Sequence, residues 1–198
     1  MEPSFYQIFR SAKPELAKRK VYVMDTGDTL QLVLPQTGER RSVPSRTYEK
    51  WSFYRTEIDV DVFTLPFKIR PSQAGLPPQL NSNFNAAVYL GRRLDFHQYR
   101  WQSITPTLGV RQLRSQGFGY GLFAGIGSAT INDLVTSNRV GYEYEGVILD
   151  AGLAGIYDAR VFNVGLAVGF DYLIDQNRQA WVYHNKPWIG VLFGLNLN

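Results

Sequence analysis

The chain has 198 residues, of which 44% are hydrophobic, 14% aromatic and 19% charged, and its formal net charge is +4. This length suits one compact unit, and the mild charge gives no reason to expect a nucleic-acid partner. The absence of cysteine excludes disulfides, thiolate metal sites and cysteine nucleophiles. The 12 tyrosines and 18 glycines favour β structure.

Residues 1–19 form a polar segment with two prolines, which we interpret as an N-terminal arm preceding a domain of residues 20–198. Much of the positive charge lies before residue 56 and either belongs to a solvated arm or contacts anionic lipid headgroups or lipopolysaccharide. Met1 is followed by Glu2 and Pro3 and not by a basic start and an apolar run. For an exported protein we therefore expect the signal peptide to have been removed from this chain.

From residue 20 onward, strand patterns alternate with turn signals and no amphipathic helix is predicted, so the expected class is all-β. An even number of strands allows an up-and-down antiparallel meander to close into a single barrel. Tight turns are expected at 114–116 and 158–160 and longer loops at 35–50, 132–141 and 174–179, while the proline-rich connection 71–80 does not fit this alternation. The eight predicted strands are 21–34, 53–69, 82–93, 100–113, 117–131, 142–157, 161–173 and 180–197.

The segment FNVGLAVGFDYL, residues 162–173, places bulky apolar side chains on one parity and Asn, Gly, Ala and Asp on the other. Successive side chains of a strand point to opposite faces, so one face is continuously apolar. The last strand repeats this design. We expect the apolar face to contact lipid, and the residues concerned are Phe162, Val164, Leu166, Val168, Phe170, Ile189, Val191, Phe193 and Leu195.

The opposite face of these strands has almost no Lys or Glu and too much glycine for a surface in water. Small residues and a few polar ones do fit the interior of a narrow barrel. Charges of this parity should therefore point into the lumen and pair there, because an unpaired buried carboxylate is costly. The predicted lumenal charge network consists of Asp59, Asp61, Arg93, Arg111, Asp150 and Asp171.

The final strand KPWIGVLFGLNLN resembles the closing strand of Gram-negative outer-membrane β-barrels. The segments DVDVFTLPFKIRP, PPQLNSNFNAAVYLGRR and NVGLAVGFDYLIDQNRQAWVY are similar in style to small barrel proteins of Bacteroidota whose role is not established. This resemblance covers roughly residues 50–198. It implies a transmembrane barrel of about eight strands in the outer membrane.

Catalytic and metal chemistry have few candidate residues. An outer-membrane lipid-modifying enzyme would need a histidine with a serine and an acidic or polar partner, and the chain offers only His97, near Asp95 and Ser103, and His184, beside Asn185. Glu57, Asp59 and Asp61 could gather a divalent cation, but pairing with Arg or Lys is the simpler interpretation. We therefore expect no metal, no cofactor and no enzymatic activity.

Three functions are compatible with this sequence. The first is a small outer-membrane β-barrel with a plugged polar lumen, a structural or interaction component that contacts membrane lipid or lipopolysaccharide and other envelope proteins, without an open pore. The second is a soluble β-barrel that binds a hydrophobic ligand with its bulky face inward, as lipocalins do. The third is a lipid-modifying enzyme that uses His97 or His184.

Overall fold

The computed structural model describes residues 4–10, 19–27, 29–44, 51–105, 108–158 and 163–194. In these ranges the chain is almost entirely β structure and forms one 11-stranded antiparallel sheet, which confirms the all-β prediction. The chain divides into two compact units, one made of Met1–Glu57 and Leu94–Gly117 and the other of Ile58–Arg93 and Phe118–Asn198. This division differs from the expected arm of residues 1–19 and domain of 20–198.

The first unit contains four short strands: β1 (Ser4–Arg10), β2 (Lys20–Asp25), β3 (Thr29–Val33) and β4 (Arg40–Pro44). They pair in the order β1-β2-β3-β4, and β1 also pairs with β5. The expected single strand 21–34 is a hairpin that turns at Thr26 and Gly27, and β1 lies in the segment interpreted as an arm. The core of this unit includes Ile8, Val21 and Leu32 from these strands, together with Phe53 of the strand Trp51–Arg70 and Tyr99 of the strand Asn85–Ser103.

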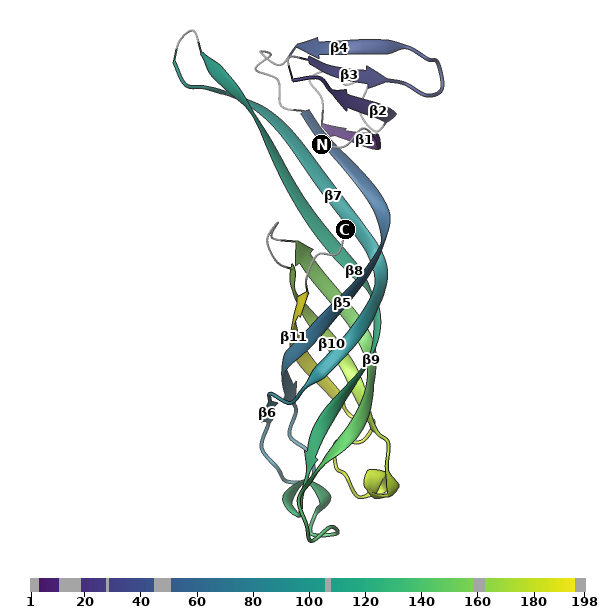
Figure 1. Ribbon diagram of the computed structural model, residues 1–198, viewed down its shortest axis with the longest axis vertical. Helices are drawn as coiled ribbons and strands as arrows, with labels where there is room; N and C mark the ends of the chain where they lie inside the picture. Colours follow the sequence, from purple (N-terminus) through teal and green to yellow (C-terminus); the bar gives the residue numbers. More distant parts are fainter. Residues whose placement is uncertain are drawn as a thin grey trace. The chain divides into compact units, whose positions relative to one another are not determined.

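Apart from the short β6 (Gln79–Asn81), which pairs with β5, six longer strands make up the rest of the sheet: β5 (Trp51–Arg70), β7 (Asn85–Ser103), β8 (Gly109–Ile131), β9 (Tyr144–Asp158), β10 (Asn163–Leu173) and β11 (Pro187–Gly194). They pair in the order β5-β7-β8-β9-β10-β11, and β11 pairs back onto β5 (Figure 1). The pairing therefore returns to its first strand after six strands. The expected count of eight was wrong.

The ring has two strands fewer than expected, because the predicted strands 82–93, 100–113 and 117–131 are only two strands, β7 and β8, and because the predicted strand 21–34 is a hairpin of the first unit. β7 and β8 are joined in one hairpin, at the end of which the Ile104 N–H donates to the Leu108 carbonyl, and β8 runs unbroken through the expected turn at 114–116. His97, in the stretch expected to link two strands, bonds directly to Ser115 on the adjacent strand. Neither stretch contains Gly or Pro, so polar residues alone did not mark a turn.

One end of the second unit carries all of its long connections. These are residues 71–84, which include β6 (Gln79–Asn81), residues 132–143 with the short helix η2 (Leu134–Thr136), and residues 174–186 with η3 (Gln176–Gln179). The connection 71–80, which did not fit the eight-strand alternation, belongs to this set. No helix within the described ranges is long and apolar enough to cross a membrane.

These loops are packed. The Val182 N–H donates to the Val135 carbonyl, and Trp181 and Tyr183 are buried in one cluster with Val135, Ile131 and Leu173. Asp133 and Asp175 cap η2 and η3 by accepting backbone N–H groups, which fixes where each loop begins to turn. The loop end of this unit is therefore closed by a small hydrophobic core of its own.

The interior of the second unit depends on glycines that leave room for large side chains. A Cβ atom added at Gly169 would lie 2.7 Å from Cζ2 of the buried Trp188 and 2.8 Å from the Ala151 carbonyl oxygen. A Cβ atom at Gly155, on the neighbouring strand, would meet nothing closer than Phe118 Cζ at 3.8 Å. Gly169 faces the packed interior, whereas Gly155 shares the face of the exposed Leu153 and Tyr157, so space is limiting at the interior glycine and not at the outward one.

We expect Gly169→Ala to lower the free energy of unfolding by about 1–3 kcal/mol, because overpacking forces the surrounding backbone and rings to shift. Gly155→Ala serves as the matched control and should have little effect. The midpoint of denaturant unfolding, followed by tryptophan fluorescence, measures both variants. Equal midpoints for the two would contradict this account of the packing.

Candidate functional site

The side chains of the second unit separate cleanly into an exposed apolar set and a buried mixed set. On β10, Leu166, Val168 and Phe170 are 64%, 49% and 53% exposed, whereas Asn163, Ala167 and Asp171 are buried. We call the exposed apolar side chains that the six strands carry within the second unit the apolar belt. Its members are Ile58, Val60, Val62, Phe67, Ile69, Val88, Leu90, Phe118, Tyr120, Leu122, Ile126, Val147, Leu149, Leu153, Tyr157, Leu166, Val168, Phe170, Tyr172, Ile189 and Phe193.

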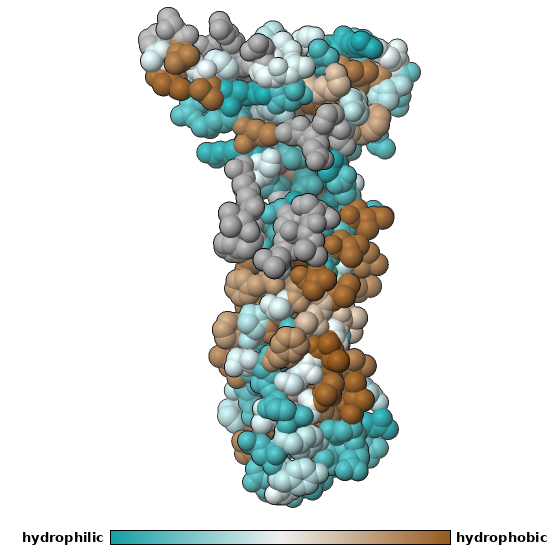
Figure 2. Space-filling model, viewed as in Figure 1, coloured by the Kyte–Doolittle hydropathy of each residue, from teal (hydrophilic) through white to brown (hydrophobic). Residues whose placement is uncertain are grey.

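The belt includes most of the residues predicted to contact lipid. Leu166, Val168, Phe170, Ile189 and Phe193 are exposed, while Val164 and Val191 are half-buried. Phe162 and Leu195 lie outside the described residues. Figure 2 shows brown, hydrophobic residues over the strands of this unit and teal, hydrophilic ones over its loops.

The buried face carries ionised groups. Asp150 on β9 and Asp171 on β10 stand directly opposite each other, an arrangement that would repel if nothing lay between them. Lys68 Nζ, from β5, lies 2.7 Å from Asp150 Oδ2 and 2.9 Å from Asp171 Oδ1. Arg70 Nη2 lies 2.5 Å from Asp171 Oδ2. We call these four residues the buried ion-pair chain; their side chains are between 0% and 4% exposed.

Aromatic rings complete the surroundings of the two cations. Lys68 Nζ lies 4.4 Å from the ring centroid of Trp188, and the Arg70 guanidinium lies 5.1 Å from Trp181 and 5.6 Å from Tyr183. Cations over aromatic faces gain electrostatic attraction that is stronger away from water. The Asp150 carboxylate fits because β8 has no side chain at Gly125, where a Cβ atom would lie 2.3 Å from Asp150 Oδ1.

Sequence parity missed Lys68 and Arg70 because β5 contains a bulge. Val191 pairs with Phe67 but Phe193 pairs with Thr64, so two steps along β11 match three along β5. Asp59 and Asp61 are buried before this irregularity, and Lys68 and Arg70, on the other parity, after it. Pro66 lies within it, and a proline inside a strand often marks a bulge. That proline was the signal that could have revealed both cations.

The six predicted lumenal charges are divided between the two units, five in the second and one in the first. Asp150 and Asp171 belong to the buried ion-pair chain. Asp59 and Asp61 are also buried, Asp61 Oδ2 accepts from Asn163 Nδ2 at 3.3 Å, and Arg93 pairs with Asp158. Arg111 lies in the first unit.

Arg111 pairs there with Asp25, which also accepts from the Tyr99 hydroxyl at 3.3 Å and the Gly27 N–H at 2.9 Å. Partial burial acts to raise the pKa of Asp25, but the Gly27 N–H and the Arg111 guanidinium hold that pKa below its usual value. Burial and the adjacent Asp25 raise the pKa of Tyr99 above its usual range.

The two histidines have different surroundings. His97 Nδ1 lies 2.8 Å from Ser115 Oγ, whereas Ser103, its expected neighbour, donates to the Thr105 carbonyl. His184 Nδ1 accepts the Leu173 N–H at 3.3 Å, and the His184 ring lies 4.7 Å from that of Tyr172.

Glu57, Asp59 and Asp61, the three carboxylates that could have gathered a cation, differ in their exposure and lie in different units. Glu57 is exposed and pairs with Arg55, while Asp59 and Asp61 are buried in the other unit. Within the described part of the chain, no group of three acidic or histidine side chains is arranged to hold a metal ion.

Comparison of this chain with known proteins identified no relative. No protein-family model matches the sequence, and no curated protein or solved structure matches the chain. The chemistry of the site therefore stands on the geometry described above.

We expect Lys68→Met to lower the free energy of unfolding by about 3–5 kcal/mol, because it leaves Asp150 and Asp171 buried and facing each other. The double variant Lys68→Met with Asp150→Asn should recover part of this loss, since Arg70 still pairs with Asp171. Denaturant midpoints provide the measurement. The control is Arg92→Met, an exposed cation on β7, which should change stability by about 0.5 kcal/mol or less. A Lys68→Met variant as stable as this control would refute the role of the ion-pair chain.

Proposed function

We propose that this protein is a small outer-membrane β-barrel of six strands with a plugged polar lumen, which acts as a structural or interaction component of the membrane and not as an open pore. The observation that carries this proposal is the combination of an apolar belt on the exposed face with ion pairs on the buried face. A soluble protein has the opposite distribution. The resemblance of the strand patterns to small Gram-negative barrels supports the same assignment.

The belt argues against water as the solvent of the exposed face. Soluble monomers rarely expose contiguous apolar patches larger than a few hundred Å². Burying one large apolar side chain is worth about 1.5–3 kcal/mol, and each of the six strands exposes at least two such side chains. A hydrocarbon environment would recover this free energy around the ring. The closed pairing of β11 with β5 also meets the requirement that backbone groups in lipid be satisfied within the protein.

The strand lengths are suitable for such an environment. A tilted transmembrane strand needs about 9–11 residues, and β9 and β10 have 15 and 11. Tyr157 and Tyr172, near the ends of these strands, are 44% and 37% exposed. Aromatic residues at the ends of an apolar band are typical of the headgroup level.

The soluble ligand-binding alternative requires the bulky face to line a cavity. Leu166 and Phe170, which would have to line it, are instead among the exposed side chains. The buried face holds Asp150, Asp171 and Lys68, which are unsuited to a hydrophobic ligand. We therefore do not retain this alternative as a proposal.

The plugged lumen follows from size. An eight-stranded barrel has an interior just wide enough for side chains, and a ring of six strands is narrower. Its interior contains Phe63, Tyr89, Phe123 and Trp188 together with the buried ion-pair chain. Long connections of outer-membrane barrels face the cell exterior, so we assign the loop end of this unit to the outside.

A charge placed in the belt tests the membrane assignment. Leu166→Arg should prevent assembly in lipid bilayers, because arginine at the bilayer midplane costs about 2–4 kcal/mol. Leu134→Arg is the matched control: Leu134 is 57% exposed but lies in the loop helix η2. The measurement is the fraction of refolded protein that floats with vesicles on a density gradient. Equal flotation of both variants, or wild-type protein that stays monodisperse without detergent, would contradict the proposal.

The plugged lumen predicts that the wild-type protein in planar bilayers shows no discrete conductance steps. An open eight-stranded or larger barrel of known conductance, inserted in the same bilayers, provides the positive control. Reproducible single-channel steps from the wild-type protein would show that ions pass the interior and would overturn this part of the proposal.

A further inference from the structure

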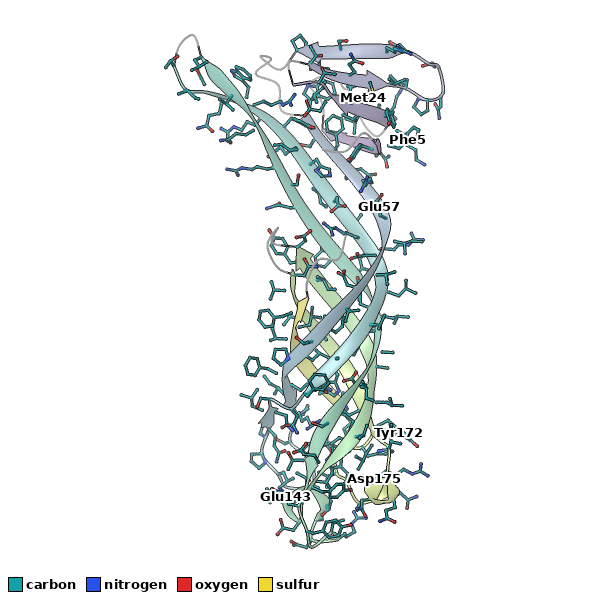
Figure 3. The ribbon with its side chains drawn as sticks, in the orientation of Figure 1. Phe5, Met24, Glu57, Glu143, Tyr172 and Asp175 are labelled. Atoms are coloured by element: carbon teal, nitrogen blue, oxygen red, sulfur yellow. The ribbon has the colours of Figure 1, made fainter. Side chains whose placement is uncertain are left out.

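At the loop end, where the apolar belt stops, we define a cationic rim of four residues: Tyr172, Arg178 and His184, whose side chains contact one another through Tyr172, and Lys186, two residues further along the chain. Arg178 Nη1 donates to the Tyr172 hydroxyl at 2.8 Å, and the ring of Tyr172 lies against that of His184. Tyr172 and Asp175 lie at the same end of this unit as Glu143 (Figure 3). The guanidinium of Arg178 is therefore held at the margin of the belt.

The backbone fixes the other half of the cluster. His184 Nδ1 accepts the Leu173 N–H, so the ring hydrogen of the neutral imidazole lies on Nε2 and is available as a donor. Burial and the nearby Arg178 lower the pKa of His184, which favours the neutral imidazole. Asn185 turns the chain with φ of 53°, and its N–H donates to the Asp171 carbonyl. Lys186 follows directly and is exposed.

The cations of the rim differ from those of the interior. Lys68, Arg70 and Arg93 each pair with an aspartate, whereas neither Arg178 nor Lys186 has an acidic partner among the residues that the structure describes. The carboxylates of the same loops bond to neutral donors: Glu145 accepts from Thr130, Glu143 from Asn132 and Asp175 from Tyr144. Arg178 and Lys186 are therefore two positive charges of the rim without an ion-pair partner among the described residues.

The apolar belt continues immediately beside these charges. Phe170, two residues before Tyr172, pairs with Pro187, the residue after Lys186, and Ile189 lies two residues further along β11. Phe170 and Ile189 are each 53% exposed. A ligand that fits both surfaces must combine an anionic head with apolar chains.

We propose that the cationic rim binds the phosphate headgroup of an anionic membrane lipid, whose acyl chains lie along Phe170 and Ile189. This inference rests on the proposed membrane function. It adds that the cationic rim, at the edge of the apolar belt, would bind anionic lipids in preference to neutral ones. Guanidinium and ammonium groups are the usual partners of phosphate, and Arg178 retains donors beyond the one it gives to Tyr172. The Nε2–H of His184 supplies a further neutral donor.

The test uses the full chain in phosphatidylcholine nanodiscs that contain either bis-phosphorylated lipid A or the same lipid without its phosphates. The lipid retained by the protein is measured by native mass spectrometry. Each cation at an anionic surface contributes about fivefold, so the double variant Arg178→Gln/Lys186→Gln should bind phosphorylated lipid A roughly 25-fold more weakly. Inorganic phosphate in the buffer should not displace the lipid, because it cannot contact the belt.

The matched control Arg92→Gln/Arg100→Gln removes two exposed charges from β7 and should retain the lipid as wild type does. Equal losses in both double variants would show a general effect of charge and overturn the site. Displacement by inorganic phosphate would overturn a lipid as the occupant. Protein that enters nanodiscs but shows no preference for the phosphorylated lipid contradicts only this inference, whereas failure to enter them contradicts the proposed function itself.

Discussion

The antiparallel pairing of β11 with β5 is the interaction on which the second unit depends. It returns the order of six strands to its first member, so each of these strands is paired on both sides. A ring this small has little interior volume. The volume limit in turn restricts how many large side chains can lie inside, and the apolar side chains of the opposite strand face are left on the outside.

The same limit explains how charges and glycines are placed. Trp188, Tyr89 and Phe63 occupy the interior only where a facing strand has glycine or alanine, as Gly169 does beside Trp188. Asp150 fits against Gly125 for the same reason. The aspartates that face each other on β9 and β10 are compatible only because the β5 bulge turns Lys68 inward between them. The bulge in β5 therefore places one lysine where it neutralises the aspartates of two other strands, β9 and β10.

Periodicity predicted much of the second unit. The alternation along residues 162–173 identified the exposed and buried faces of β10, since a strand without Pro keeps its parity from end to end. It failed at β5, where Pro66 shifts the parity and Lys68 and Arg70 were missed. The prediction also failed at residues 94–100, which were expected to be a connection but are part of β7. This stretch contains no Gly or Pro, and its pairing with β8, where His97 contacts Ser115, depends on the long hairpin and not on local sequence. The strands β1 and β4 were missed because each is short and depends on its neighbours in the sheet.

The cationic rim could not be predicted because its members are brought together by closure and not by spacing. Tyr172 lies next to the last residue of β10, Arg178 lies in the short helix η3, and His184 and Lys186 precede β11. Asp175 caps η3 at Asn177, which directs Arg178 back toward Tyr172, and the Asn185 turn brings His184 beside the same ring. The closure that forces apolar side chains outward also gathers these cations at the margin of the belt. An amphipathic lipid would contact the cationic rim with its headgroup and the apolar belt with its acyl chains. The lipid that surrounds the exposed face and the ligand of the rim would then be the same kind of molecule.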